Sequence, residues 1–378
     1  MNFNRSVFFS RLPWVNFWVA YLLIRIFRLL PGFYHRQVNP LTMKCYLAIE
    51  AGAQGWNAIE FKELYRSALE YFGTDSVMRV VIDKAIPYTP QVEEVLSNRQ
   101  ITHYLYDPRT GRQDFWGAFS ESIHIAILLA RYQIIPVVYL TDLSYRQWRC
   151  QAAATSAFSG VVVTFMMPKQ VQPIFPHRRL VGPSLMPLSI ETLDYLQRLR
   201  LKLSNSNAIE RVVRFTGSLY EPRTTFLQHF KEKLSATDHR VDVLGRELGS
   251  ARVSDDEYWR RLSSAAIVIT TADQAVQAGT DWTWIPHLVY RYLEVLASGS
   301  LLLAPAVPGV SRYFEPGNHF VCFESLEDAI EKARFYMDHP QEAESIRMAG
   351  HEKAAQLIRI HSFWLQIDTA LGSDSIFR

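Results

Sequence analysis

The chain has 378 residues, of which 48% are hydrophobic and 20% charged, so it is long enough for two ordinary globular domains and is not of disordered composition. A net charge of only +3 argues against general nucleic-acid binding. The three cysteines lie far apart without the spacing of metal ligands, which disfavours zinc and disulfide frameworks and fits a reducing cytoplasm.

The first 47 residues carry a charge of +6 and precede the first acidic residue, Glu50, which leaves −3 for the remainder. Within them, Leu12–Leu30 reads LPWVNFWVAYLLIRIFRLL, and its uncharged run of 13 residues is shorter than the roughly 20 that cross a bilayer. No signal-peptide cleavage site follows. Aromatic and aliphatic side chains beside arginines predict an N-terminal amphipathic helix in residues 1–40, with peripheral membrane contact through residues 1–35. Packing against the protein's own body or a second copy is the alternative. We therefore expect a cytoplasmic protein at the inner face of a membrane.

From residue 41 to residue 200, β-branched apolar runs alternate with helical patterns, which predicts parallel βαβ units. We expect strands at Lys44–Ile49, Val77–Ile82, Thr102–Tyr106, Ile134–Thr141 and Gly160–Phe165. We expect helices at Ala58–Phe72, Gln91–Ser97, Phe115–Tyr132 and Tyr145–Phe158.

The alternation restarts after a polar stretch, Lys202–Glu210, which reads as a linker. Strands are then expected at Val212–Thr216, Val241–Leu244, Ala266–Thr270, Leu301–Ala304 and Phe320–Phe323. Helices are expected at Arg223–Ser235, Asp255–Ser264, Leu288–Ala297 and Leu326–Asp338, with more helix from Gln341 onward. The predicted fold is α/β, with two Rossmann-like doubly wound domains, residues 41–204 and 205–378, that face a cleft.

Three segments of the second half contain motifs in a characteristic order. RYLEVLASGSLLLAP (Arg291–Pro305) has a glutamate-bearing helix before a strand, and FEPGNHFVCFESLEDAIEKARFYMDHP (Phe314–Pro340) continues with F-E-P-G, a strand and a helix. VRFTGSLYEPRTTFL (Val213–Leu227) has a strand followed by Gly-Ser and Y-x-x-R. Over roughly residues 212–360 the chain resembles the donor domain of GT-B glycosyltransferases, most closely the spore-maturation-protein-like subgroup. The first half has only a generic likeness to the acceptor domain.

The resemblance implies that Glu294 accepts hydrogen bonds from the ribose hydroxyls of a nucleotide-sugar, a task that suits a carboxylate. The alternative is a glutamate on a solvated helix face. Arg291 lies three residues earlier on the same face and either reaches the diphosphate or pairs with Glu294.

The turn after the predicted strand Val212–Thr216 is the candidate diphosphate site. Gly217 and Ser218 offer backbone N–H groups near the start of a helix, and Arg223 offers a positive charge. The alternative is an ordinary β–α turn with a surface arginine.

Many retaining relatives carry a glutamate eight residues before the ribose glutamate, but this chain has Pro286 there, so inversion and retention both stay open. Asp281, in the polar and aromatic stretch just upstream, and His287, beside Pro286, are further donor-pocket candidates, with a mobile loop as the alternative.

An inverting enzyme needs a general base, for which Glu50 and Asp142 are candidates because they stand near predicted strand ends. Helix capping or surface solvation is the alternative for both. The sequence has no D-x-D motif, so we expect no metal and no cofactor.

These features together predict a metal-independent glycosyltransferase that moves a sugar from a nucleotide-sugar to an acceptor hydroxyl. The basic N-terminus favours a lipid-linked or cell-envelope glycan at a membrane surface as the acceptor. The alternatives are a nucleotide-sugar epimerase of the same fold and a catalytically degenerate, membrane-associated scaffold.

Overall fold

The computed structural model describes residues 5–30, 47–52, 58–83, 86–98, 101–108, 114–141, 153–155, 157, 161–172, 179–247, 253–271 and 287–372. The chain forms two compact units. The first comprises residues 1–54, 68–184 and 366–378, and the second comprises residues 55–67 and 185–365.

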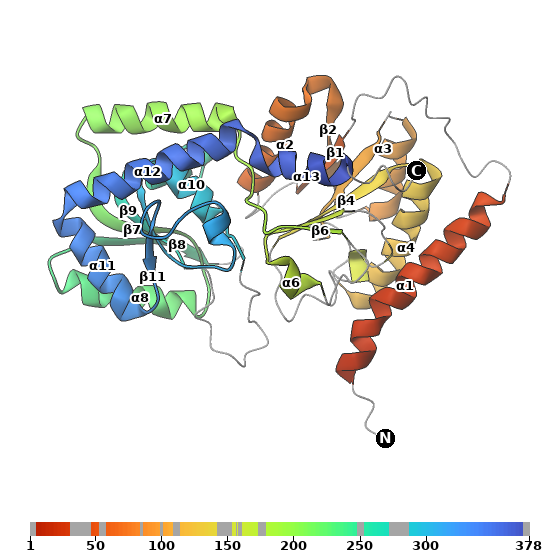
Figure 1. Cartoon of the computed structure of the whole chain (residues 1–378), viewed down its shortest axis with the longest axis horizontal. Helices are drawn as coiled ribbons and strands as arrows, with labels where there is room; N and C mark the ends of the chain where they lie inside the picture. Colours follow the sequence, from red (N-terminus) through yellow and green to blue (C-terminus); the bar gives the residue numbers. More distant parts are fainter. Residues whose placement is uncertain are drawn as a thin grey trace. The chain divides into compact units, whose positions relative to one another are not determined.

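A six-stranded parallel sheet in the order β2-β1-β3-β4-β5-β6 forms the centre of the first unit (Figure 1). Its strands are β1 (Leu47–Gly52), β2 (Val77–Ile82), β3 (His103–Tyr106), β4 (Ile135–Leu140), β5 (Val161–Thr164) and β6 (Arg179–Val181). Its helices are α1 (Arg5–Arg28), α3 (Tyr88–Asn98), α4 (Phe115–Arg131) and the short α6 (Pro168–Val171), with a 3-10 turn at Thr74–Ser76. Helix α13 (Ser362–Gly372) is divided between the units after Leu365. Helix α2 (Ala58–Phe72) is divided between the units after Ser67.

A five-stranded parallel sheet in the order β11-β10-β9-β7-β8 forms the centre of the second unit. Its strands are β7 (Glu210–Leu219), β8 (Val241–Glu247), β9 (Ala265–Ile269), β10 (Leu301–Pro305) and β11 (Val321–Phe323). Its helices are α7 (Ile190–Asn205), α8 (Arg223–Ser235), α9 (Asp255–Ser263), α10 (Arg291–Ala297), α11 (Leu326–Asp338) and α12 (Pro340–Arg359), with a 3-10 turn at Val310–Arg312. Two Rossmann-like parallel sheets are therefore present, as predicted.

Strand β10 illustrates why the strands of the second sheet are apolar without interruption. Leu301 and Leu303 belong to the core on one face of the sheet, and Leu302 and Ala304 belong to the core on the other face. Successive side chains of a strand point to opposite faces, so a strand covered on both sides must be apolar at every position. Helices α8 and α11 supply the first core, and α7, α9, α10 and α12 supply the second.

The predicted linker, Lys202–Glu210, is wrong, and the compact units divide at Ser184–Leu185. Helix α7 continues to Asn205 because it packs Leu193, Leu196 and Leu203 against the second unit, although its outer face is polar. Sequence reasoning also missed β6. Of the strand predicted at Lys44–Ile49, the first three residues lie outside the described ranges, as does most of the helix predicted at Tyr145–Phe158.

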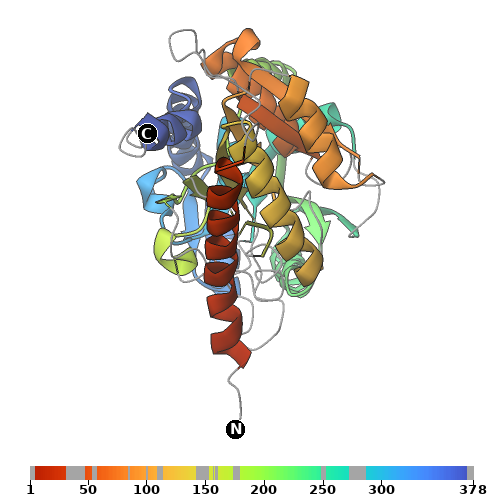
Figure 2. The same cartoon turned by 90° about the vertical axis from the view of Figure 1, so that its right-hand side faces the viewer.

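Helix α1 lies along α4 in the first unit (Figure 2). Asn16 is fully buried and its Nδ2 donates to the Ser122 hydroxyl at 2.9 Å and to the Phe119 carbonyl at 3.3 Å. Ala20 is buried as well, one turn later. Over the described part of the chain, no helix combines the length and the apolar character that spanning a bilayer requires.

His103, the first residue of β3, makes the stability of the fold depend on pH. Burial lowers the pKa of its imidazole to about 4, although Asp368 partly opposes the shift. In the unfolded chain the imidazole is protonated below about pH 6.5, whereas in the folded chain it stays neutral down to about pH 4. The free energy of unfolding therefore decreases as the pH drops from 6.5 towards 4. We expect a loss of roughly 2 kcal/mol over this window, somewhat less than the full pKa difference implies because the ring keeps some access to water.

The measurement is urea unfolding at pH 7.5 and at pH 5 for the wild type and for His103→Gln, which cannot titrate. For each protein, the free energy of unfolding at pH 5 is subtracted from that at pH 7.5. The wild type should lose more than His103→Gln, and the difference is due to His103 because the other histidines are common to both proteins. Equal loss of stability in the two proteins would contradict the prediction.

Candidate functional site

The candidate site lies at the carboxyl ends of the strands of the second sheet. The chain runs from β7 outward to β8 and then returns to β9 on the other side of β7, so the strand order reverses between β7 and β9. In open parallel sheets, ligands bind at the carboxyl ends of the strands where the order reverses. Gly217 and Ser218 belong to the last three residues of β7, where they pair with Gly245 and Arg246 of β8, so the turn predicted to begin at Gly217 is wrong. Thr271 comes two residues after the end of β9.

Arg223, the first residue of α8, joins these two strand ends. Its Nη1 donates to the Ser218 carbonyl at 3.1 Å, and its Nε donates to the Thr271 hydroxyl at 2.8 Å. Nη2 donates to the Thr271 carbonyl at 3.3 Å, and the guanidinium lies 4.3 Å from the centre of the Tyr220 ring. Arg223 is therefore fixed at the switch point and is not a solvated surface side chain.

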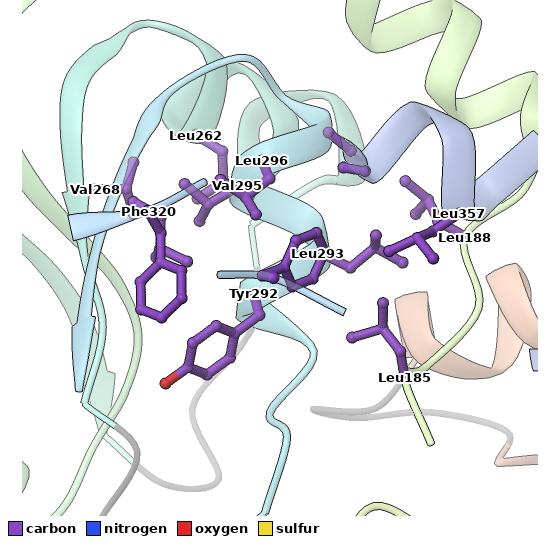
Figure 3. Packing of buried hydrophobic residues seen from close by; sticks show 14 of the residues in the cluster. Leu185, Leu188, Leu262, Val268, Tyr292, Leu293, Val295, Leu296, Phe320 and Leu357 are labelled. Carbon is purple, nitrogen blue, oxygen red and sulfur yellow. The ribbon is translucent and has the colours of Figure 1, made fainter. Parts of the chain in front are cut away.

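Glu294 and Arg291 meet on one side of the short helix α10. Glu294 is 4% exposed, and its Oε2 is 3.6 Å from Nη1 of Arg291. The Tyr258 hydroxyl donates to Glu294 Oε1 at 2.7 Å and accepts from Arg291 Nη1 at 2.7 Å. The remaining side chains of α10, Tyr292 to Ala297, pack into the core around the helix (Figure 3). The alternative of a solvated glutamate is therefore wrong.

The surroundings keep Arg291 charged. Burial lowers the pKa of its guanidinium, but Tyr258 and Glu294 outweigh that effect, so the pKa is raised overall. Of the two roles considered for Arg291, the structure contains the pairing with Glu294. The contact with the diphosphate stays a prediction, for which the charged guanidinium lies close to Gly217 of β7.

Gly217, in the last three residues of β7, lies close to Arg291 of helix α10. A methyl group at this position would lie 3.5 Å from Arg291 Nη2 and 3.2 Å from Cζ of Phe215. Its φ of +152° belongs to a region that side chains rarely adopt. Glycine therefore lets the backbone and a buried guanidinium approach closely.

The structure thus gathers Gly217, Ser218, Arg223, Arg291 and Glu294 on the second unit at the ends of β7, β9 and α10. His287 is buried just before α10. Asp281, Pro286 and Asp142 lie outside the described residues, so the roles expected of them stay predictions.

Glu50 belongs to the first unit and does not stand at the end of its strand. β1 continues to Gly52 because Ala51 and Gly52 still pair with Val81 and Ile82 of β2. Its role as a base stays a prediction.

Sequence reasoning missed two members of the site. Thr271 has a detectable signal, because it comes two residues after the buried strand β9. Tyr258 has none, since it lies 33 and 36 residues from its two partners. Among the residues that the structure describes, no group of three or more His, Cys, Asp or Glu side chains is placed to hold a metal ion.

Comparison with known proteins agrees with this architecture. Residues 223–362, which include Arg223, Arg291 and Glu294, match a family described as glycosyl transferase-like. A search of curated proteins found no relative.

Among solved structures, the chain is similar to Anabaena Alr3699/HepE in complex with UDP and glucose, with a TM-score of 0.54, 13% identity, and 87% of this chain and 100% of that chain covered. The UDP-glucose complex of the same protein gives 0.53 and 13%, with 87% and 99% covered. A sucrose-phosphate synthase from Thermosynechococcus elongatus gives 0.53 and 10%, with 87% and 98% covered. At these identities the likeness concerns the fold. Together, the comparisons show that the chain has the two-domain GT-B fold and that residues 223–362 match the glycosyl transferase-like family.

Proposed function

We propose that the protein transfers a sugar from a nucleotide-sugar donor to an acceptor hydroxyl, and that the donor binds at the carboxyl ends of β7 and β9. The observation that carries the proposal is the convergence of Gly217, Arg223, Arg291 and Glu294 at the switch point of the second sheet. Structural neighbours that hold UDP or UDP-glucose support a donor of this class.

Each of these groups suits one part of a nucleotide-sugar. The carboxylate of Glu294 accepts from a pair of ribose hydroxyls. The backbone that runs from Gly217 and Ser218, at the carboxyl-terminal part of β7, to the start of α8 at Arg223 would offer N–H groups to the diphosphate. Arg223 and Arg291 neutralise the charge that develops on the leaving nucleoside diphosphate, so catalysis by electrostatic stabilisation needs no metal ion.

The motifs around Glu294 and F-E-P-G further support membership of the spore-maturation-protein-like subgroup. Because Pro286 replaces the glutamate of many retaining relatives, experiment must decide between inversion and retention at the sugar carbon.

The test is a thermal-shift screen with UDP-, GDP-, ADP-, CMP- and dTDP-sugars, since a ligand of the folded state stabilises it in proportion to its affinity. One class of nucleotide should raise Tm in a saturable manner. No stabilisation by any of them at millimolar concentration would overturn the proposal. Turnover that requires an added acceptor separates a transferase from an epimerase.

The acceptor in this proposal is a lipid-linked or cell-envelope glycan at the inner face of a membrane, and the exposed part of α1 supports it. Almost half of the exposed large hydrophobic side chains of the described residues lie between residues 15 and 30. We call them the α1 face: Val15, Trp18, Val19, Tyr21, Leu22, Ile26, Leu29 and Leu30. Exposed Arg25 and Arg28 lie among them, and no acidic residue occurs before Glu50, so the surface suits an anionic membrane.

Replacing Trp18, Leu22 and Ile26 of the α1 face together by alanine should lower binding to phosphatidylglycerol-containing vesicles roughly 100-fold, because each side chain contributes about 1 kcal/mol in the interface. Vesicle co-sedimentation measures the partition coefficient. The matched control, Phe335→Ala with Met348→Ala, removes exposed apolar side chains of the second unit and should leave binding unchanged. A wild-type protein that stays in the supernatant would remove the support for a membrane acceptor.

A further inference from the structure

The hydroxyl of Tyr258 is the centre of the network that holds the two charged residues of α10. Tyr258 belongs to α9, a different helix from its partners. The direct separation between Arg291 Nη1 and Glu294 Oε2, 3.6 Å, is longer than a hydrogen bond, whereas both residues are 2.7 Å from the hydroxyl. The tyrosine therefore connects the two charges.

The chemistry of the three groups fixes the direction of both hydrogen bonds. A guanidinium only donates and a carboxylate only accepts, so the hydroxyl must accept from Arg291 and donate to Glu294. Both bonds involve an ionised partner, which makes each stronger than a bond between neutral groups. Neither charged side chain can rotate away without breaking a bond to the same oxygen.

The ring of Tyr258 is itself held in place. It packs against the core of the second unit and makes an edge contact with Trp259, with ring centres 5.1 Å apart. The Arg291 guanidinium carbon lies 5.3 Å from the centre of the Tyr258 ring, so the same side chain holds the guanidinium by its face as well as by its hydroxyl.

We infer that Tyr258 is the positioning residue of the donor site, which keeps the Glu294 carboxylate aimed at the ribose hydroxyls and the Arg291 guanidinium beside the Gly217 backbone. The inference rests on the proposed function, because it assigns Tyr258 a role in that site. In the proposed donor site, Tyr258 contacts neither the sugar nor the phosphates and acts through Glu294 and Arg291. A misplacement of binding groups by about 1 Å is enough to weaken a site strongly.

The experiment uses the full chain and measures the Kd of UDP, GDP, ADP, CDP and dTDP for the wild type, Tyr258→Phe and Tyr195→Phe. Phenylalanine keeps the ring and removes only the hydroxyl. Tyr195→Phe is the matched control, because its hydroxyl donates to Asp256 at 3.3 Å in the same unit. We expect Tyr258→Phe to raise the Kd of the binding nucleotide about tenfold and Tyr195→Phe to leave it unchanged.

The Kd of the nucleotide for a double variant, Tyr258→Phe with Glu294→Gln, distinguishes a role in positioning Glu294 from a purely structural role. Tyr258 and Glu294 share one network, so the combined loss in the double variant should be clearly smaller than the product of the two single losses, although the release of Arg291 still costs some binding. Independent, multiplying losses would overturn the inference, as would an unchanged Kd in Tyr258→Phe, even if its Tm falls. Absence of binding by the wild type would instead overturn the proposed function, and the inference with it.

Discussion

Glu294→Gln should lower kcat/KM for the nucleotide-sugar about 100-fold, mainly through a higher KM. Glutamine is nearly isosteric and can still accept from Tyr258, but it offers one neutral acceptor where the carboxylate offers two charged oxygens. A hydrogen bond to a charged group contributes about 1.5–3 kcal/mol, and the ribose contact exists in both the ground state and the transition state. Initial-rate kinetics at varied donor concentration separate the two constants.

The control for Glu294→Gln is Glu257→Gln, which neutralises a partly exposed carboxylate on α9 that pairs with Arg261 at 2.8 Å. The control should retain wild-type kinetics. Because Glu294→Gln leaves the buried Arg291 without its charged partner, the protein should also lose stability, so the rates are compared per folded molecule. Kinetics that match the wild type would mean that Glu294 is a structural residue and that the ribose binds elsewhere.

All strands except β6 were predictable because parallel strands buried on two faces have nearly continuous apolar sequences, whereas β6 is short and only partly buried. β2 has the predicted bounds, and β10 differs from prediction by one residue. β7 extends to Glu210 at one end and Leu219 at the other, beyond the predicted Val212–Thr216. Its first residues are polar, so hydrophobic patterning could not detect them, and pairing with β8 and β9 extends the strand.

Helix α7 was not predicted, and its last four residues were read as part of a linker. Its capping residue, Ser189, donates through its hydroxyl to the buried carboxylate of Glu63, 126 residues away in the sequence, and so does its backbone N–H. The helix therefore depends on a partner that no local pattern reveals.

The residues of the candidate site also fall into a group that local sequence identifies and a group that it does not. Glu294 and Arg291 could be found because they belong to one short motif whose helical spacing places them on the same face. Tyr258, which connects them, and Thr271, which holds Arg223, come from other elements and meet them only when the sheet has formed. Local sequence could therefore identify the charged groups of the site but could not identify the residues that position them.

Gly217→Ala should weaken nucleotide binding about 100-fold, because the added methyl group stands where the β7 backbone approaches Arg291. It would lie 3.2 Å from Cζ of Phe215, so the ring or the backbone must shift by a few tenths of an ångström, and 3.5 Å from Arg291 Nη2, which is an ordinary contact. The crowded ring and the strained backbone both act on the segment of β7 proposed to hold the diphosphate, where small misplacements of binding groups have large effects. The φ of +152° adds about 1–3 kcal/mol of backbone strain.

Gly317→Ala separates the strain from the loss of space. Gly317 also has a positive φ, +84°, but a methyl group there meets no atom within 4 Å. Both variants should therefore unfold at lower urea concentration than the wild type, whereas only Gly217→Ala should raise the Kd of the nucleotide in an isothermal titration. If the two variants bind the nucleotide equally well, the close approach at Gly217 serves the packing of β7 against α10, and the diphosphate is held by other groups.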